Sequence, residues 1–119
     1  MPRPTAVKLR TVSRILEVRF DDGSTFDLPF EYLRVFSPSA EVTGHSAGEG
    51  ILQTGKEEVT IVRIEPVGNY ALRLHFSDGH NTGLYSWDVL HELGSRQTAN
   101  WARYLERCAE AGIARKSAS

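Results

Sequence analysis

Histidine is the residue type in this sequence with the clearest capacity for chemistry, because its imidazole binds metal ions and titrates near neutral pH. The chain has four histidines. His75 alternates with apolar residues in a strand-like run, and His91 lies on the polar side of a short helical segment. His45 lies in a long polar stretch and His80 directly follows a turn. His45 and His80 are therefore the pair that could converge on an ion or on a partner.

The spacing of possible metal ligands does not strengthen that assignment. No His-x-Glu or His-x-Asp pair begins a facial iron triad, and there is no His-Glu-x-x-His motif. The one cysteine excludes a disulfide framework and any multi-cysteine zinc or iron–sulfur site built from this chain alone. Cys108 also falls within an apolar helical stripe, which favours a small buried hydrophobe over a reactive thiol. We expect no cofactor, with iron or zinc bound weakly through His45 and His80 as the alternative.

Two other kinds of active site can be excluded by their motifs. Residues 50–56 have the spacing of a phosphate-binding loop, but Glu57 stands where a Ser or Thr should ligate magnesium, and Glu58 would repel phosphate. A strand-like pattern follows, without the helix N-terminus that holds the anion. There is no Gly-x-Ser-x-Gly elbow, and Asp22 and Asp78 occupy turn positions that Asp tolerates. The sequence therefore predicts no enzyme activity.

Two Asp-Gly turns organise the chain into related halves. Each turn, Asp22-Gly23 and Asp78-Gly79, lies between two segments of alternating apolar and polar residues, a pattern typical of β-hairpins. Each hairpin leads into a short, partly apolar helical segment, and in the second half Ser86 is the expected N-cap and Gly94 the residue after the helix. The expected strands and short helices cover residues 14–20, 25–28, 30–35, 70–76, 80–85 and 86–93.

The remaining segments complete an α+β fold. Residues 37–58 form a long polar loop, and residues 59–67 alternate as a further strand. Residues 95–113 form the clearest helix, with one apolar stripe. We expect two β-hairpin-plus-short-helix units that share one mostly antiparallel sheet, covered by this C-terminal amphipathic helix. The stripe of that helix consists of Trp101, Tyr104, Leu105 and Cys108.

Composition and charge bound the class of protein. The 119 residues are 40% hydrophobic and carry a formal net charge of -1, which fits a single domain over residues 12–113. Residues 1–11 are expected to be a basic N-terminal arm and residues 114–119 a disordered tail. No apolar run is long enough to span a membrane and the N-terminus lacks a signal-peptide core, so we expect a cytoplasmic protein. No basic stripe is interleaved with aromatic residues, which argues against nucleic-acid binding.

Three stretches resemble a known family in order and spacing. They are LRVFSPSAEVTGH, IEPVGNYAL and DGHNTGLYSWDVL, at residues 33–45, 64–72 and 78–90. They are similar to the bacterial single-domain branch of the γ-butyrobetaine hydroxylase N-terminal-like domain family. In that family the domain is the N-terminal module of γ-butyrobetaine and trimethyllysine dioxygenases, is appended to iron–sulfur carrier ATPases, or occurs alone. The dioxygenase active site lies in a separate jelly-roll domain, so the resemblance does not imply oxygenase activity.

The resemblance also implies where a structural zinc would lie. The dioxygenase modules hold zinc through three cysteines and one histidine, and the histidine falls on His80. The cysteine positions fall on Ser37, Ser39 and Val42. Hydroxyls are poor zinc ligands at neutral pH and valine is none, so the resemblance implies no family-type zinc site. Either His80 hydrogen-bonds the loop at residues 37–39, or it holds a weaker ion together with His45 and Glu41.

We expect from these observations a non-catalytic protein-interaction module. Its partner would be a protein, and the resemblance points to an iron–sulfur carrier ATPase or an iron-dependent enzyme. The alternative is a metal-binding accessory protein in iron handling or iron–sulfur cluster assembly. The pattern favours a core position for Trp87, and Asn69 could simply supply a turn, whereas Arg34 and Tyr85 are left partly exposed. The expected interaction surface consists of Arg34, His45, Asn69, His80, Tyr85 and Trp87.

Overall fold

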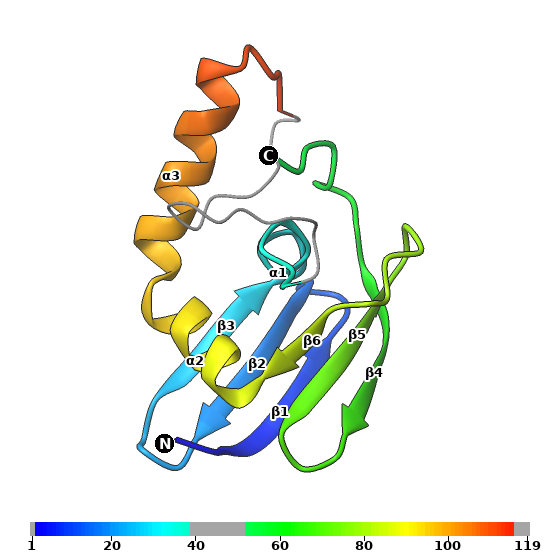
Figure 1. The fold of residues 1–119 in the computed structure, drawn as a ribbon, viewed down its shortest axis with the longest axis vertical. Helices are drawn as coiled ribbons and strands as arrows, with labels where there is room; N and C mark the ends of the chain where they lie inside the picture. The colour runs from blue at the N-terminus through cyan, green and yellow to red at the C-terminus, as the bar shows by residue number, and fades with distance from the viewer. Residues whose placement is uncertain (1, 39–51, 116–119) are drawn as a thin grey trace.

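The structure, a computed structural model, describes residues 2–38 and 52–115. These residues form two three-stranded antiparallel sheets, with strand orders β1-β2-β3 and β4-β5-β6, and three helices (Figure 1). The strands are β1 Pro4–Arg10, β2 Ile15–Phe20, β3 Thr25–Pro29, β4 Ile61–Val67, β5 Ala71–Phe76 and β6 Leu84–Ser86. The helices are α1 Phe30–Val35, α2 Trp87–Ser95 and α3 Gln97–Glu110.

The two Asp-Gly hairpins form as the alternation predicts. Gly23 and Gly79 adopt φ angles of 90° and 89°, a left-handed conformation that glycine adopts without strain. The alternating apolar residues of β2 and β5 all point into one core, which also receives side chains from α1 and α2. That core gives each sheet one buried face and places both turns at its edge. The core residues of β2 and β5 are Leu16, Val18, Phe20, Leu72, Leu74 and Phe76.

The α+β class, the antiparallel pairing and the C-terminal helix are confirmed, but each unit has a three-stranded sheet of its own instead of sharing one. Strand β1 pairs with β2 of the first hairpin and lies where a basic arm was expected. That expectation was wrong because Val7 and Leu9 alternate with Lys8 and Arg10 and pack against the core. Arg10 Nε donates to Glu17 Oε1 at 2.9 Å on the neighbouring strand, so its charge is matched within the sheet.

Helix α2 begins as predicted but ends later. The Ser86 hydroxyl accepts a hydrogen bond from the Val89 N–H at 3.2 Å, which makes it the N-cap. The helix continues through Gly94 to Ser95, so Gly94 does not follow the helix end. A Cβ atom at position 94 would lie 2.3 Å from the Phe26 ring, and glycine is therefore needed for the close approach of α2 to β3.

Helix α3 lies beside α1 (Figure 1), and aromatic residues of its apolar stripe contact that helix and its C-cap. The Trp101 ring meets Tyr32 edge-on at 6.1 Å between centroids, and Tyr104 meets Phe36 at 6.4 Å. Helix α3 therefore contacts the sheets through α1. Leu105, at the edge of the stripe, is 39% exposed. The amphipathic pattern correctly indicates a buried face without specifying which element covers it.

The C-terminal segment differs from the expected disordered tail at Arg115. This side chain forms an ion pair with Glu31 of α1, and residues 116–119 lie outside the described part of the chain.

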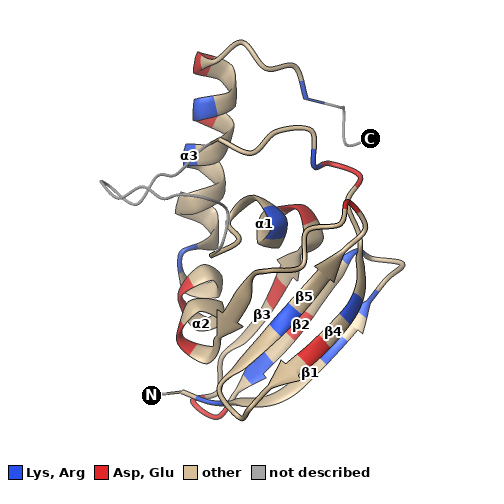
Figure 2. Ribbon diagram, turned by 45° about the vertical axis from the view of Figure 1, so that its right-hand side comes forward, with Lys and Arg blue, Asp and Glu red and all other residues tan. Residues whose placement is uncertain are grey.

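Lys and Arg are interspersed with Asp and Glu along the strands (Figure 2). Within the described ranges, no helix combines the length and apolarity that a membrane span requires.

Candidate functional site

The residues expected to form one interaction surface lie at two places, at opposite ends of β5. Asn69 and Trp87 lie beside the turn that precedes β5, whereas Arg34 and His80 lie beside the turn that follows it. Tyr85 is buried beneath α1, and His45 lies outside the described residues. The structure therefore divides the predicted surface into a polar network and an exposed turn.

The polar network is centred on Asp78, and we call it the Asp78 network. Asp78 Oδ2 accepts hydrogen bonds from Arg34 Nε at 2.9 Å and from Lys56 Nζ at 2.8 Å, while Oδ1 accepts from the His80 backbone N–H at 3.1 Å. His80 Nε2 in turn lies 2.8 Å from Ser37 Oγ. The predicted hydrogen bond between His80 and the loop at Ser37 is thus present. The network joins α1, the second hairpin and the segment before β4.

The sequence pattern predicts that Arg34 and Tyr85 are partly exposed, but both side chains are buried. The Arg34 side chain is 8% exposed, and Tyr85 is fully buried with its hydroxyl donating to the Leu33 carbonyl at 2.6 Å. A pattern of charged and apolar residues cannot reveal that a buried guanidinium has a carboxylate partner 44 residues away. Neither side chain is available to a docking partner in this conformation.

The electrostatics of the network keep Asp78 ionised. Burial raises the pKa of its carboxyl, but the hydrogen bonds from Lys56, the His80 backbone and Arg34 outweigh burial and lower the pKa to about 2. Burial raises the pKa of the Tyr85 hydroxyl, so this group remains a neutral donor at neutral pH. The network therefore contains a fixed carboxylate between two cations.

Ser37, His80 and Asp78 are residue types that hydrolases use, so their arrangement deserves comparison with a catalytic triad. In a triad the carboxylate accepts from the imidazole ring, whereas Asp78 accepts from the backbone N–H of His80. Ser37 is only 7% exposed, and a Cβ atom at Gly83 would lie 2.5 Å from its Oγ. A hydroxyl packed this closely cannot receive a substrate carbonyl, which indicates a structural role for the three residues.

The same residues do not fit the zinc site of the family. His80 Nε2 is engaged with a serine hydroxyl, a poor zinc ligand. Across residues 2–38 and 52–115, no three His, Cys, Asp or Glu side chains are grouped to hold a metal ion. The other residues considered as ligands or at the family's cysteine positions lie outside the described residues. They are Ser39, Glu41, Val42 and His45.

Removing the His80 imidazole tests the role of the Asp78 network. We expect His80→Ala to lower the free energy of unfolding by about 1–3 kcal/mol, because Ser37 loses a buried hydrogen-bond partner. Urea denaturation measures the change, and elemental analysis of the purified protein should show the same metal content as in the wild type. His75→Ala is the matched control, since His75 pairs with the half-exposed Glu65 and should cost less. An unchanged stability, or a metal lost with His80, would contradict the structural role.

The other end of β5 carries an exposed aromatic turn. Trp87 Nε1 donates to the Asn69 carbonyl at 2.8 Å, and the Trp87 backbone N–H donates to the Tyr70 carbonyl at 3.2 Å. Tyr70 is 53% exposed, and its ring lies over Gly68, where a Cβ atom would be 3.0 Å away. We call Asn69, Tyr70 and Trp87 the turn patch. The Tyr70 ring is half-exposed, whereas Trp87 is partly buried and packs against the core, and β5 and α2 hold the backbone of the patch in place.

Sequence reasoning missed three residues of these two places. The expected strand at residues 70–76 includes Tyr70, but β5 begins only at Ala71, so Tyr70 lies in the turn. Asp78 has a sufficient local explanation as a turn residue, and Lys56 lies in the segment that has the spacing of a phosphate-binding loop. A Gly-Asn-Tyr turn next to a strand is the one signal that could have indicated the exposed tyrosine.

Comparisons with known proteins agree with this architecture. The family model described as gamma-butyrobetaine hydroxylase-like, N-terminal, matches residues 7–91. The chain therefore belongs to this family. No curated protein matches the chain.

Solved structures place the chain among proteins of similar size. A solution structure determined by NMR is 51% identical, with a TM-score of 0.84, and the match covers 97% of this chain and 86% of the other. A second NMR structure is 46% identical, with a TM-score of 0.82 over 99% of this chain and 95% of the other. A crystal structure of a DUF971-family protein of unknown function from Acidithiobacillus ferrooxidans is 43% identical, with a TM-score of 0.64 over 77% and 92%. The family and the fold of the chain are thus shown.

Proposed function

We propose that this chain is a non-catalytic protein-interaction module that binds its partner through the turn patch. The observation that supports this most is the half-exposed side chain of Tyr70, which follows the Asn69 carbonyl that accepts the Trp87 indole N–H. An exposed tyrosine is among the side chains that contribute most binding energy at protein interfaces. Because β5 and α2 hold this turn, binding costs little ordering of the patch.

The Asp78 network contributes to this function by its rigidity. It ties α1 to the second hairpin at the far end of β5, so the hairpin is held at both ends. The resemblance to domains fused to iron–sulfur carrier ATPases and iron-dependent enzymes favours a partner from those classes. A metal-binding accessory role would instead require His80 to exchange Ser37 for an ion.

Truncating Tyr70 tests the proposal. We expect Tyr70→Ala to weaken partner binding by about 2 kcal/mol, roughly thirty-fold, because the variant removes the exposed ring and leaves the backbone of the turn intact. Affinity capture with the full chain from extracts of the source cells, quantified for each retained protein, measures the loss.

Val62→Ala is the matched control, because Val62 is 63% exposed on β4 of the same sheet. It should retain the proteins that the wild type retains. Equal retention by Tyr70→Ala and the wild type, or an equal loss with Val62→Ala, would argue against docking at the turn patch.

A further inference from the structure

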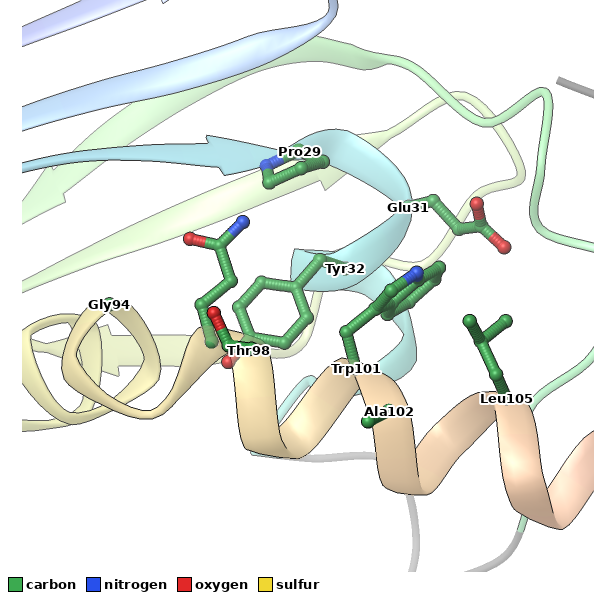
Figure 3. A pocket seen from close by; sticks show the side chains of 9 residues that line it. Pro29, Glu31, Tyr32, Gly94, Thr98, Trp101, Ala102 and Leu105 are labelled. Atoms are coloured by element: carbon green, nitrogen blue, oxygen red, sulfur yellow. The ribbon is translucent and has the colours of Figure 1, made fainter. Parts of the chain in front are cut away.

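A groove lies between α1 and α3, and it is lined by residues that belong to neither the turn patch nor the Asp78 network. Its volume is about 550 Å³, and Figure 3 shows Glu31 and Tyr32 of α1 on one side and Thr98, Trp101 and Leu105 of α3 on the other. Leu105 is 39% exposed although it lies at the edge of the apolar stripe. The groove thus combines apolar walls with the carboxylate of Glu31.

One side chain of the protein itself already binds at this carboxylate. Arg115 Nη1 and Nη2 donate to the two carboxylate oxygens of Glu31 at 2.5 and 3.0 Å. Its guanidinium carbon also lies 5.3 Å from the centre of the Trp101 ring and 5.6 Å from that of Tyr104. The two rings are stacked, with centroids 4.9 Å apart. A forked ion pair and an aromatic platform are the two features that select a guanidinium over an ammonium.

We propose that Glu31, Trp101 and Tyr104 form a binding site for an arginine side chain, occupied in the free protein by Arg115. The ligand is a peptide segment of a partner protein, whose arginine replaces Arg115 while its flanking residues lie along the groove. This inference goes beyond the turn patch and does not depend on it.

Two observations support exchange of the occupant. Arg115 reaches the site from the end of α3 through a short coil that begins at Gly112, which has a φ of 71°. The contacts of Arg115 with Glu31 and Trp101 are made by its guanidinium, and residue 115 belongs to no strand, so the side chain can leave without breaking backbone pairing of the sheets. Glu31 and Trp101 also line the groove, so a ligand arginine at the site would be continuous with the groove.

Exchange can be measured with N-acetyl-arginine amide as the probe. The indole N–H of Trp101 is followed by NMR in the full chain during titration of the wild type and of Arg115→Ala. We expect saturable shifts in Arg115→Ala and an apparent affinity at least about ten-fold weaker in the wild type, where the tethered Arg115 competes at high effective concentration. Adding Glu31→Gln to the variant should abolish saturation, and N-acetyl-lysine amide should bind more weakly than the arginine probe.

The amide spectrum of the two sheets reports in the same samples that each variant is folded. Arg115→Gln, which removes the charge but keeps part of the side-chain length, provides a second opened site should Arg115→Ala unfold. Absence of saturation in the folded opened site, or equal binding of the arginine and lysine probes, would overturn the proposal. Tyr70→Ala should leave this titration unchanged, so the outcome is separate from that of the turn patch.

Discussion

Replacing Gly94 by alanine is expected to lower the free energy of unfolding by about 1–3 kcal/mol. The added Cβ atom would lie 2.3–2.6 Å from three atoms of the Phe26 ring, far inside the distance at which carbon atoms touch. Phe26 itself packs edge-on against Phe20 and His91, so its ring cannot move without disturbing these contacts. Thermal and urea denaturation of the full chain measure the loss.

The sign of the change in the free energy of unfolding distinguishes a close approach of α2 to β3 from a looser one. In a helix free of such contacts, alanine is favoured over glycine by about 1 kcal/mol, so Gly94→Ala would stabilise the protein if α2 did not approach β3 this closely. Glu92→Ala, at an exposed position of the same helix, should change stability little. A variant more stable than the wild type would show that α2 does not pack closely against the Phe26 ring.

Asp78→Asn is expected to destabilise the protein by about 2 kcal/mol. Removing one partner of a buried ion pair costs about 3–5 kcal/mol, and we expect less because Asp78 is 27% exposed. Asparagine keeps the turn and can still accept from the His80 N–H, but it leaves the 8% exposed guanidinium of Arg34 without a counter-charge. Chemical denaturation at pH 7 measures the difference. Glu65→Gln is the control, since Glu65 is 47% exposed and pairs with exposed cations.

The pH dependence of the difference in the free energy of unfolding between the wild type and Asp78→Asn identifies its electrostatic origin. Because the folded protein lowers the pKa of Asp78 to about 2, the stability that its charge provides is fully present above about pH 4 and is lost as the pH falls toward 2. The difference in the free energy of unfolding between the wild type and Asp78→Asn should therefore decrease between about pH 4 and pH 2. A gap that stays constant from pH 7 to pH 2 would mean that Asp78 acts only through turn geometry.

Local patterns predicted the hairpins because each is specified by neighbouring residues. Alternation fixes which side chains of β2 and β5 face the core, and the Asp-Gly pairs fix the turns. Strand β1 was not predicted because its basic residues are also typical of a charged arm, and the ion pair of Arg10 with Glu17 on β2 is not visible in the local pattern. The division into two sheets depends on which strands pair across the fold, which periodicity within one strand does not encode.

The candidate site was predicted only in part for the same reason. The contact between His80 and Ser37 followed from the family resemblance, which places these residues at corresponding ligand positions. Arg34 and Asp78, however, meet across 44 residues of sequence, and Glu31 and Arg115 across 84. Each of these side chains has an ordinary local explanation as a surface charge or a turn residue, so only the three-dimensional arrangement shows their pairing.

Site-directed photo-crosslinking tests the proposed interaction function most directly. A benzophenone amino acid is placed at position 70, or at position 62 as the control, in the full chain produced in the source cells. We expect a discrete protein adduct from position 70 that is weak or missing from position 62, since Tyr70 lies in the turn patch and Val62 on the outer part of β4. Identical adducts from both positions, or none from position 70, would contradict docking through the turn patch.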